Sequence, residues 1–164
     1  MAAPTKIRAC RKFPAPTAII LIAGIGVGAT AWAQQDKEKI IAERQDAMKQ
    51  QGREMIAVRN YFQDKGDQAT ALAALVSLKG SVPKVLEWFP AGTGLGQVSV
   101  KTRAKPEIWQ DQDKFVAADK TVIGQIDTLE AAVKGGDKAK TETVYNEIKF
   151  CDACHSTFRA PEQR

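Results

Sequence analysis

The chain has 164 residues, of which 44% are apolar and 26% are charged. This composition is typical of one folded domain and excludes disordered and collagen-like chains. The formal net charge is +5, but four basic residues lie in the first dozen positions and no acidic residue precedes Asp36. Residues 34–164 therefore carry 20 basic and 19 acidic side chains, a net charge of +1, which does not point to nucleic acid as a partner.

Residues 1–33 have the layout of a secretory signal peptide. A cationic stretch precedes an apolar run from about Pro14 to Trp32, and the small-residue signature Ala31-Trp32-Ala33 follows. We expect cleavage after Ala33 and export of one folded domain, residues 34–164, to the periplasm. An uncleaved membrane anchor is the alternative, because the apolar run approaches the ~20 residues that span a bilayer.

The first two helices are predicted from apolar spacing. Between Lys37 and about Gln63, apolar residues recur at steps of seven, which is typical of a helix packed on others; they are Ile41, Met48, Met55 and Phe62. A second helix is expected from Gln68 to about Leu78. The interruption at Gly80, Ser81 and Pro83 then predicts a break, followed by a short helical turn from Lys84 to Trp88.

The glycine-rich run that starts at Pro90 predicts one long connection, which continues to Lys105. A third helix is expected from Pro106 to Gly135, because apolar residues again repeat at seven; they are Ile108, Phe115, Val122 and Leu129. Asp137 is the expected N-cap of a fourth helix that ends near Pro161. The fold class predicted by this pattern is all-α, an antiparallel four-helix bundle.

Near the C-terminus stands the pentapeptide Cys151-Asp152-Ala153-Cys154-His155. The pattern CxxCH is the attachment sequence of c-type haem. Two thiols at this spacing reach one edge of a porphyrin and form thioethers with its vinyl groups, and the adjacent imidazole becomes the proximal iron ligand. His155 is the one histidine of the chain. We therefore expect a single haem c on Cys151 and Cys154, with His155 on the iron.

Two cysteines at this spacing also occur in three different kinds of site. A dithiol oxidoreductase would carry its CxxC at the start of a helix in a βαβ unit, which this helical pattern does not offer. A zinc site needs about four ligands, and Cys151, Cys154 and His155 fall short of that number. A redox-inert disulfide would leave His155 without a role.

With its motif at the C-terminal end, the sequence resembles the class II cytochromes c, the family of cytochrome c′ and its low-spin relatives. The resemblance covers most of residues 36–160 and rests on three segments: the motif with Phe158-Arg159, the run Arg103-Ala104-Lys105-Pro106-Glu107-Ile108-Trp109, and Arg44-Gln45 with Met48. It implies one covalently bound haem in a four-helix bundle. Members of the family often form antiparallel homodimers, so a homodimer is an expectation here.

The resemblance leaves two states of the sixth iron position open. In cytochrome c′ an apolar side chain of the first helix covers the distal face, the iron is five-coordinate, and small gases such as nitric oxide bind. In the low-spin relatives a methionine of that helix ligates the iron, and Met48, four residues after Arg44, occupies the matching place. A core packing role is the alternative for Met48. Met55, two turns further on, is the weaker ligand candidate.

The resemblance also implies that Arg159, four residues after His155, lies beside the haem edge or the proximal imidazole. A solvated charge near a helix C-terminus is the alternative for this arginine. Aromatic side chains are expected either to line the haem pocket or to fill the core; these are Trp88, Trp109, Phe115 and Phe158.

These residues predict an exported monohaem cytochrome that carries single electrons and performs no covalent chemistry on a substrate. Met–His ligation raises the reduction potential and closes the iron to ligands, which suits electron transfer. The expected partners are redox proteins of the periplasm. A five-coordinate, gas-binding protein is the second hypothesis, and a haem-free interaction bundle is the third.

Overall fold

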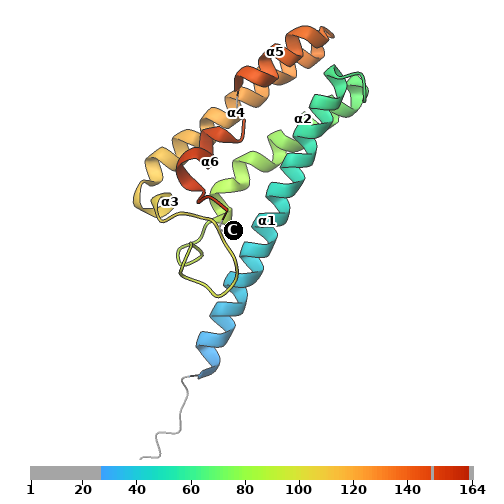
Figure 1. Cartoon of the computed structure of the whole chain (residues 1–164). Coiled ribbons are helices and arrows are strands. Elements are labelled where there is room, and N and C mark those ends of the chain that lie inside the picture. Colours follow the sequence, from blue (N-terminus) through green and yellow to red (C-terminus); the bar gives the residue numbers. More distant parts are fainter. Residues whose placement is uncertain (1–26, 149, 163–164) are drawn as a thin grey trace, which may run out of the picture.

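The computed structural model describes residues 27–148 and 150–162, with side chains from residue 35 onward. This part of the chain folds into helices, which Figure 1 shows in chain order. They are α1 (Val27–Phe62), α2 (Gln68–Ser81), the 3-10 helix η1 (Val82–Trp88), α3 (Glu107–Gln110), α4 (Gln112–Lys134), α5 (Lys138–Ile148) and α6 (Asp152–Phe158). An isolated antiparallel bridge pairs Ala104 with Arg159.

Four of the helices form the bundle that the sequence predicts. α1 packs against α2 and α5, and α4 packs against the same two helices, so the four close a ring. In Figure 1, α1 with α2 and α4 with α5 form two hairpins whose turns lie at the same end. Fully buried apolar side chains hold the ring together, each contributing about 1.5–3 kcal/mol; they include Val58, Leu75, Leu78, Ile126, Leu129 and Val133.

The hairpin turns follow local rules of helix termination. Asp67 caps α2, because its carboxylate accepts a hydrogen bond of 2.7 Å from the backbone N–H of Thr70. Asp137 caps α5 in the same way, with a hydrogen bond of 3.0 Å from the N–H of Lys140. Gly136 precedes it at φ +75°, a left-handed conformation that favours glycine.

The predicted third helix is interrupted, which corrects the sequence-based expectation. The structure has the short α3 and the long α4 in place of one helix from Pro106 to Gly135. Asp111 lies between them with φ −131° and ψ 63°, and its side chain accepts from the N–H of Lys114. Aspartate competes for the free N–H groups of a helix start, so it begins a new helix instead of continuing the old one.

The predicted fourth helix is also divided. α5 ends at Ile148 and α6 begins at Asp152, where one helix from Asp137 to near Pro161 was expected. The carbonyl of Ile148 accepts a hydrogen bond from the side-chain amide of Gln125 in α4. The broken helix end therefore keeps a partner for its free carbonyl, as buried helix ends require.

At the N-terminus, α1 begins at Val27, ten residues before the predicted start of the first helix. The predicted leader lies mostly outside the described residues, and its cleavage after Ala33 stays a prediction. The break predicted near Pro83 is present as the change from α2 to the tighter η1.

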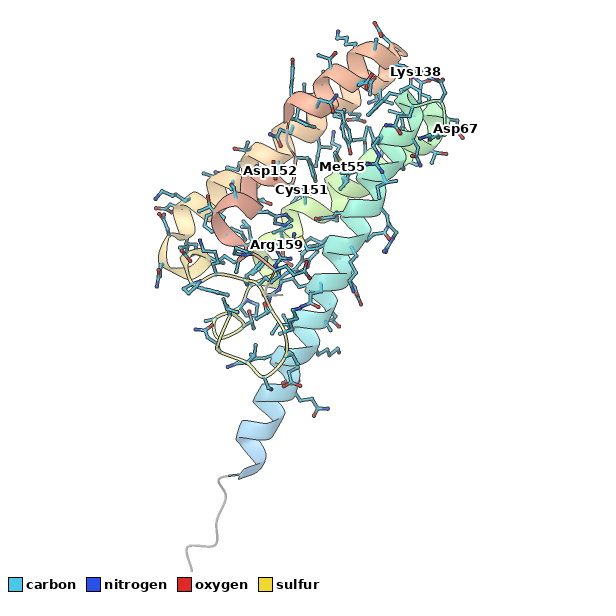
Figure 2. The ribbon with its side chains drawn as sticks, viewed as in Figure 1. Met55, Asp67, Lys138, Cys151, Asp152 and Arg159 are labelled. Carbon is cyan, nitrogen blue, oxygen red and sulfur yellow. The ribbon has the colours of Figure 1, made fainter. Side chains whose placement is uncertain are left out.

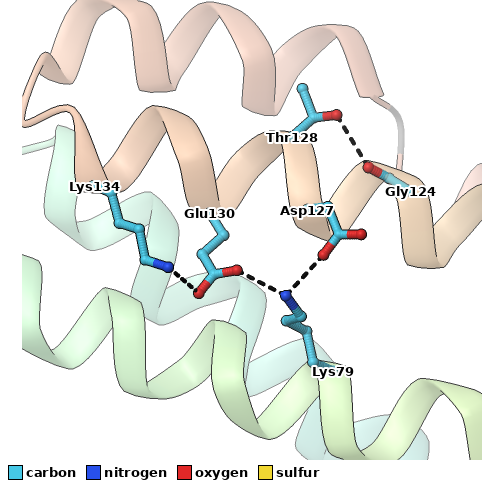
Figure 3. Close-up of polar contacts among 6 residues, drawn as sticks. All are labelled: Lys79, Gly124, Asp127, Thr128, Glu130 and Lys134. Carbon is cyan, nitrogen blue, oxygen red and sulfur yellow. Dashed lines mark hydrogen bonds and ion pairs between the residues drawn. The ribbon is translucent and has the colours of Figure 1, made fainter.

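Among the described residues, one helical segment, Gln68–Trp88, is long and apolar enough to cross a membrane. It consists of α2 and η1, and its apolar inner face is part of the bundle core. Lys79 of this segment forms ion pairs of 2.8 Å with both Asp127 and Glu130 of α4 (Figure 3). The segment therefore packs as a helix of the bundle.

Candidate functional site

A cavity of about 690 Å³ lies among α1, η1, α4, α6 and the connection that leads into α3. Its walls are mainly apolar, and they belong to two core clusters. The larger cluster fills the bundle toward the hairpin turns, and the smaller one is built around Phe115 and Phe158. Cys154 touches both clusters, so the cavity lies at the junction between them.

The residues of the CxxCH motif share one wall of this cavity. Cys151 is the N-cap of α6, and Cys154 follows one helical turn later, so both side chains lie on the same face. Both are free thiols, and both line the cavity together with His155. In Figure 2, Cys151 and Asp152 lie at the start of α6, and Arg159 lies just beyond its end.

The C-terminal segment is held in place by the connection before α3. The N–H of Lys105 donates to the carbonyl of Phe158 over 3.0 Å, and the N–H of Ala160 donates to the carbonyl of Arg103 over 2.8 Å. The guanidinium of Arg103 also donates to the carbonyl of Ala160, over 2.7 Å. This pairing explains why Arg103-Ala104-Lys105 accompanies the motif: it fixes the end of α6 and the backbone of Arg159.

Both thiols are less acidic than an ordinary cysteine. Burial raises the pKa of Cys154 to about 11, and the neighbouring Asp119 and Cys151 contribute to the same shift. Burial, followed by the charge of Asp152, also raises the pKa of Cys151. A dithiol oxidoreductase needs the opposite shift, because its reactive group is the thiolate. The electrostatics of the site therefore argue against that alternative.

The surroundings of His155 favour its neutral form. Burial lowers its pKa, and the positive charges of Arg159 and Arg103 lower it further. A neutral imidazole keeps a lone pair for a metal. Within the described residues, however, no group of three or more His, Cys, Asp or Glu side chains could hold a metal ion alone. The site therefore does not fit zinc held by protein ligands.

Helix α1 contributes another part of the cavity wall. Arg44, Met48 and Gly52 follow one another at steps of four and all line the cavity. Met48 is half-buried and packs against the smaller core cluster. Met55, in contrast, is 7% exposed and belongs to the larger cluster without lining the cavity. A Cβ at Gly52 would meet nothing within 4 Å, so α1 leaves open space beside Met48.

Met48 and His155 are carried by two different helices, α1 and α6. α1 and α6 do not pack against each other in the described chain. The cavity therefore separates the helix that carries Met48 from the helix that carries His155, and both side chains reach it. Arg159, which is exposed at the end of α6, lines the same cavity.

An aromatic cluster closes the side of the cavity near α3. Phe115 and Phe158 line it as expected, with ring centroids 5.0 Å apart. Phe89, for which the sequence pattern predicts no role, also lines it and lies 5.2 Å from Phe115. Trp88 and Trp109 pack against the cluster but do not line the cavity. Both side chains are half-buried and pack against the core instead of the cavity.

Asp119 is a buried acidic residue of the cavity that was not predicted from the sequence. Asp119 of α4 is 4% exposed and lines the cavity. One feature of the sequence could have revealed it, because an acidic residue occupies a position in the inner apolar stripe of α4.

The residues present fit a c-type haem. The cavity lies within the ~300–1,000 Å³ range of cofactor pockets and is apolar with few polar groups. Its wall carries two free thiols and an imidazole whose neutral form is favoured, at the spacing that covalent attachment needs. A helical bundle with this donor set on its C-terminal helix is the architecture of a class II c-type cytochrome.

The comparisons with known proteins identify the family. The model of the family described as Cytochrome C' matches residues 39–159, and the chain belongs to this family. Its members bind one covalently attached c-type haem. A haem-free interaction bundle, the third hypothesis from the sequence, does not fit that membership.

The chain is similar to cytochrome c' of Rubrivivax gelatinosus, with 37% identity over 87 residues. The match covers 52% of this chain and 64% of the relative, so it spans less than two thirds of that protein. The crystal structure of the same cytochrome matches with a TM-score of 0.61 and 29% identity, over 73% of this chain and 94% of that one. A structure of oxidised R. palustris cytochrome c556 matches with a TM-score of 0.66 and 25% identity, over 77% of this chain and 99% of that one.

Proposed function

We propose that the protein is an exported monohaem cytochrome that carries single electrons in the periplasm. In this proposal Cys151 and Cys154 hold the haem through thioethers, His155 is the proximal iron ligand, and Met48 is the distal ligand. The bound haem supplies the one-electron change between ferric and ferrous iron. The polypeptide attaches and orients the haem, shields it from water and sets its reduction potential. We infer no turnover of a substrate.

The observation that carries this proposal is the thioether of Met48 in the cavity wall. Of the two methionines on α1, Met48 lines the cavity and Met55 is packed in the core. The open space beside Gly52 supports the entry of a planar group next to Met48. A methionine opposite a histidine gives a closed, six-coordinate iron with a raised reduction potential, which suits an electron carrier.

The positive charges at the cavity support one particular orientation of the haem. Lys49, Lys101 and Arg159 are exposed residues that line the cavity, which therefore reaches the solvent on this side. Haem carries two propionates, and cationic side chains favour such anionic groups. We infer that the propionate edge faces these residues. Arg159 is in addition close enough to lower the pKa of His155.

The second candidate function is binding of a small gas at a five-coordinate iron. The family description and the Rubrivivax relative both carry the name cytochrome c', and the resemblance associates that name with a vacant sixth position. The names of the relatives thus favour this candidate, whereas the thioether of Met48 in the cavity favours the first. The two candidates share the haem, its attachment and its proximal ligand.

The experiment that separates them is a visible spectrum of the purified holoprotein, oxidised and then reduced with dithionite. Electron transfer with Met48 on the iron predicts resolved low-spin bands, a methionine–iron charge-transfer band in the oxidised protein, and slow or absent binding of carbon monoxide after reduction. Broad high-spin bands with fast, tight carbon monoxide binding would overturn Met48 ligation and support the gas-binding function.

A pair of variants assigns the ligand. Met48→Ala is expected to convert the low-spin spectrum to a high-spin one and to open the reduced iron to carbon monoxide, because the sixth ligand is removed. Met55→Leu conserves volume in the core and is expected to leave the spectrum unchanged. A low-spin spectrum that survives Met48→Ala would contradict the assignment.

The partners and the location are part of the same proposal. We infer redox proteins of the periplasm as electron donor and acceptor. A homodimer is also inferred; the exposed apolar side chains Ile56 on α1 and Val76 on α2, 44% and 62% exposed, support a further packing partner. Sedimentation velocity of the holoprotein tests it, and a monomer at all concentrations would overturn it.

A further inference from the structure

Asp119 occupies a position that the packing of α4 reserves for apolar side chains. The inner face of this helix follows alternating steps of four and three residues, the spacing of a stripe that faces a bundle core; the stripe is Phe115, Asp119, Val122, Ile126, Leu129 and Val133. All six side chains are buried, and Asp119 is 4% exposed. Its carboxyl group lines the haem cavity.

This carboxyl group has no partner within the described part of the chain. No hydrogen bond or ion pair joins it to another described residue, and its oxygen atoms, which are not fully buried, are open to the cavity. Its electrostatic neighbour at the cavity is Cys154, whose thiol it makes less acidic. Cys154 is a proposed attachment point of the porphyrin, so the carboxyl group lies on the haem side of α4. It forms no hydrogen bond or ion pair with His155 or Met48, the two proposed iron ligands.

Among the described residues, the other charged groups that line the cavity come from three segments, and all of them except the buried Arg44 reach the solvent. They are Arg44 and Lys49 of α1, Lys101 and Arg103 of the connection, and Arg159 and Glu162 after α6. Arg44 is engaged with Thr93 and Thr102, Lys49 with Asp46, and Arg103 with Ala160 and Glu162. The elements α2, α3, α5 and η1, which also pack on α4, contribute no charged side chain to the cavity wall.

The charge state of such a carboxyl group depends on what fills the cavity. Burial raises the pKa of Asp119 above its ordinary value, because the charged form loses its hydration. A haem bound in the cavity would remove more water and would raise that pKa further. The oxidised haem carries one more positive charge than the reduced haem, and a positive charge nearby favours the carboxylate. The proton affinity of Asp119 would therefore be higher when the iron of such a haem is reduced.

We propose that Asp119 couples the uptake of one proton to the uptake of one electron by the bound haem. When a one-electron donor reduces the iron, the carboxylate of Asp119 takes a proton from solvent and forms an O–H bond. When the electron leaves, that bond breaks and the proton returns to solvent. The donor is oxidised by one electron, the iron is reduced by one, and the net charge inside the cavity stays constant.

This inference rests on the proposed haem site but not on the identity of the sixth ligand. The test is the midpoint potential of the holoprotein as a function of pH, measured by redox titration of the visible bands. Between the pKa values of Asp119 in the oxidised and reduced protein, the potential should fall as pH rises. The limit is about 59 mV per pH unit, because each unit is a tenfold change in proton activity for a one-electron couple.

Two aspartate variants on α4 make the test specific. Asp119→Asn has nearly the same shape and cannot titrate, so its potential should be independent of pH in that range. Asp113→Asn removes an exposed carboxylate from the same helix and should keep the wild-type slope. A slope that persists unchanged in Asp119→Asn would assign the coupling to another group, such as a propionate, and would overturn the proposal.

Infrared difference spectroscopy gives an answer that does not depend on the folding of a variant. Reduction of wild-type holoprotein at a pH inside the sloping range should produce the carbonyl band of a protonated carboxylic acid, which isotope-labelled aspartate shifts. If no such band appears, the proposal fails. The visible spectrum separates this outcome from failure of the electron-carrier function: high-spin bands with an intact pH slope would remove Met48 as ligand and leave Asp119 in its role.

Discussion

Arg44 carries a positive charge into the interior of the protein. It is 4% exposed, and its guanidinium donates to the carbonyl oxygen and the hydroxyl of Thr93, to the hydroxyl of Thr102 and to the carbonyl of Trp88, over 2.9–3.2 Å. It also lies 4.4 Å from the ring centroid of Phe89. Burial lowers its pKa to about 10, so it stays charged at neutral pH. One side chain thus holds the long connection against α1.

Replacing this arginine tests that role. Arg44→Met should lower the free energy of unfolding by about 3 kcal/mol, because charged hydrogen bonds are lost and buried oxygen atoms remain without donors. The control, Arg53→Met, removes an exposed arginine of α1 that donates hydrogen bonds to the side chain of Gln50, and its effect should stay within about 0.5 kcal/mol. Denaturant unfolding of the holoproteins, followed by circular dichroism, measures both. Equal effects of the two variants would contradict a clamping role.

The residues of the site were predictable to different degrees for a physical reason. Cys151, Cys154 and His155 form a local motif, because covalent attachment requires them at a fixed spacing along one helical turn. Asp119 and Phe89 acquire their place only through tertiary packing. The stripe of α4 holds the signal for Asp119, since an acid in an apolar register position is unusual. Phe89 follows η1 in a connection without periodicity, so no pattern in the sequence points to it.

At the scale of elements, the bundle itself was predictable because each long helix has an apolar stripe. The breaks at Asp111 and after Ile148 were not. Apolar residues continue with nearly helical spacing across both breaks, so periodicity alone cannot reveal them. At Asp111 a capping side chain ends the helix locally, and after Ile148 a hydrogen bond from Gln125 of α4 satisfies the freed carbonyl. The second break depends on a residue of another helix, so rules based on the local sequence cannot predict it.

Two glycines, one inside α4 and one in the turn between α4 and α5, yield a prediction. Gly136 has φ +75°, so Gly136→Ala should cost about 1–2 kcal/mol of the free energy of unfolding. Gly124 lies inside α4, where an added Cβ would meet nothing within 4 Å. Gly124→Ala should therefore stabilise the protein by about 0.5–1 kcal/mol, while its carbonyl keeps the bond from Thr128 (Figure 3).

Thermal and denaturant unfolding of the two alanine variants measures this difference in sign. If both substitutions stabilise the protein, the left-handed turn at Gly136 is not a constraint on the fold. The comparison is matched, because each variant adds one methyl group at or near the same helix.

At the scale of the whole molecule, a cluster of charges ties the two hairpins together across α2 and α4. Lys79 of α2 lies 2.8 Å from both Asp127 and Glu130, and Lys134 lies 2.8 Å from Glu130 (Figure 3). The hydrogen bonds from Lys134 and Lys79 lower the pKa of Glu130 to about 2 from an ordinary value of 4.5. Because the folded state prefers the carboxylate, its protonation must oppose folding.

The sign of the pH dependence follows from that shift. The contribution of Glu130 to stability is fully present above about pH 4.5, where the unfolded chain is also ionised, and it is lost as the pH falls toward about 2. Glu130→Gln should therefore reduce the stability of the holoprotein near neutral pH, and its difference from wild type should vanish in acid. Added salt should reduce the same difference, because charges near the surface are screened.

Unfolding curves collected across this pH range test the coupling, with Glu142→Gln on α5 as the control for an exposed carboxylate. Circular dichroism at helix wavelengths is the suitable signal, since it does not depend on the coordination of the iron. A difference between wild type and Glu130→Gln that stays constant from neutral pH to about pH 2 would mean that the ion cluster does not contribute through its charge. A difference that fades only in the Glu130 variant assigns part of the acid sensitivity of the bundle to this junction between α2 and α4.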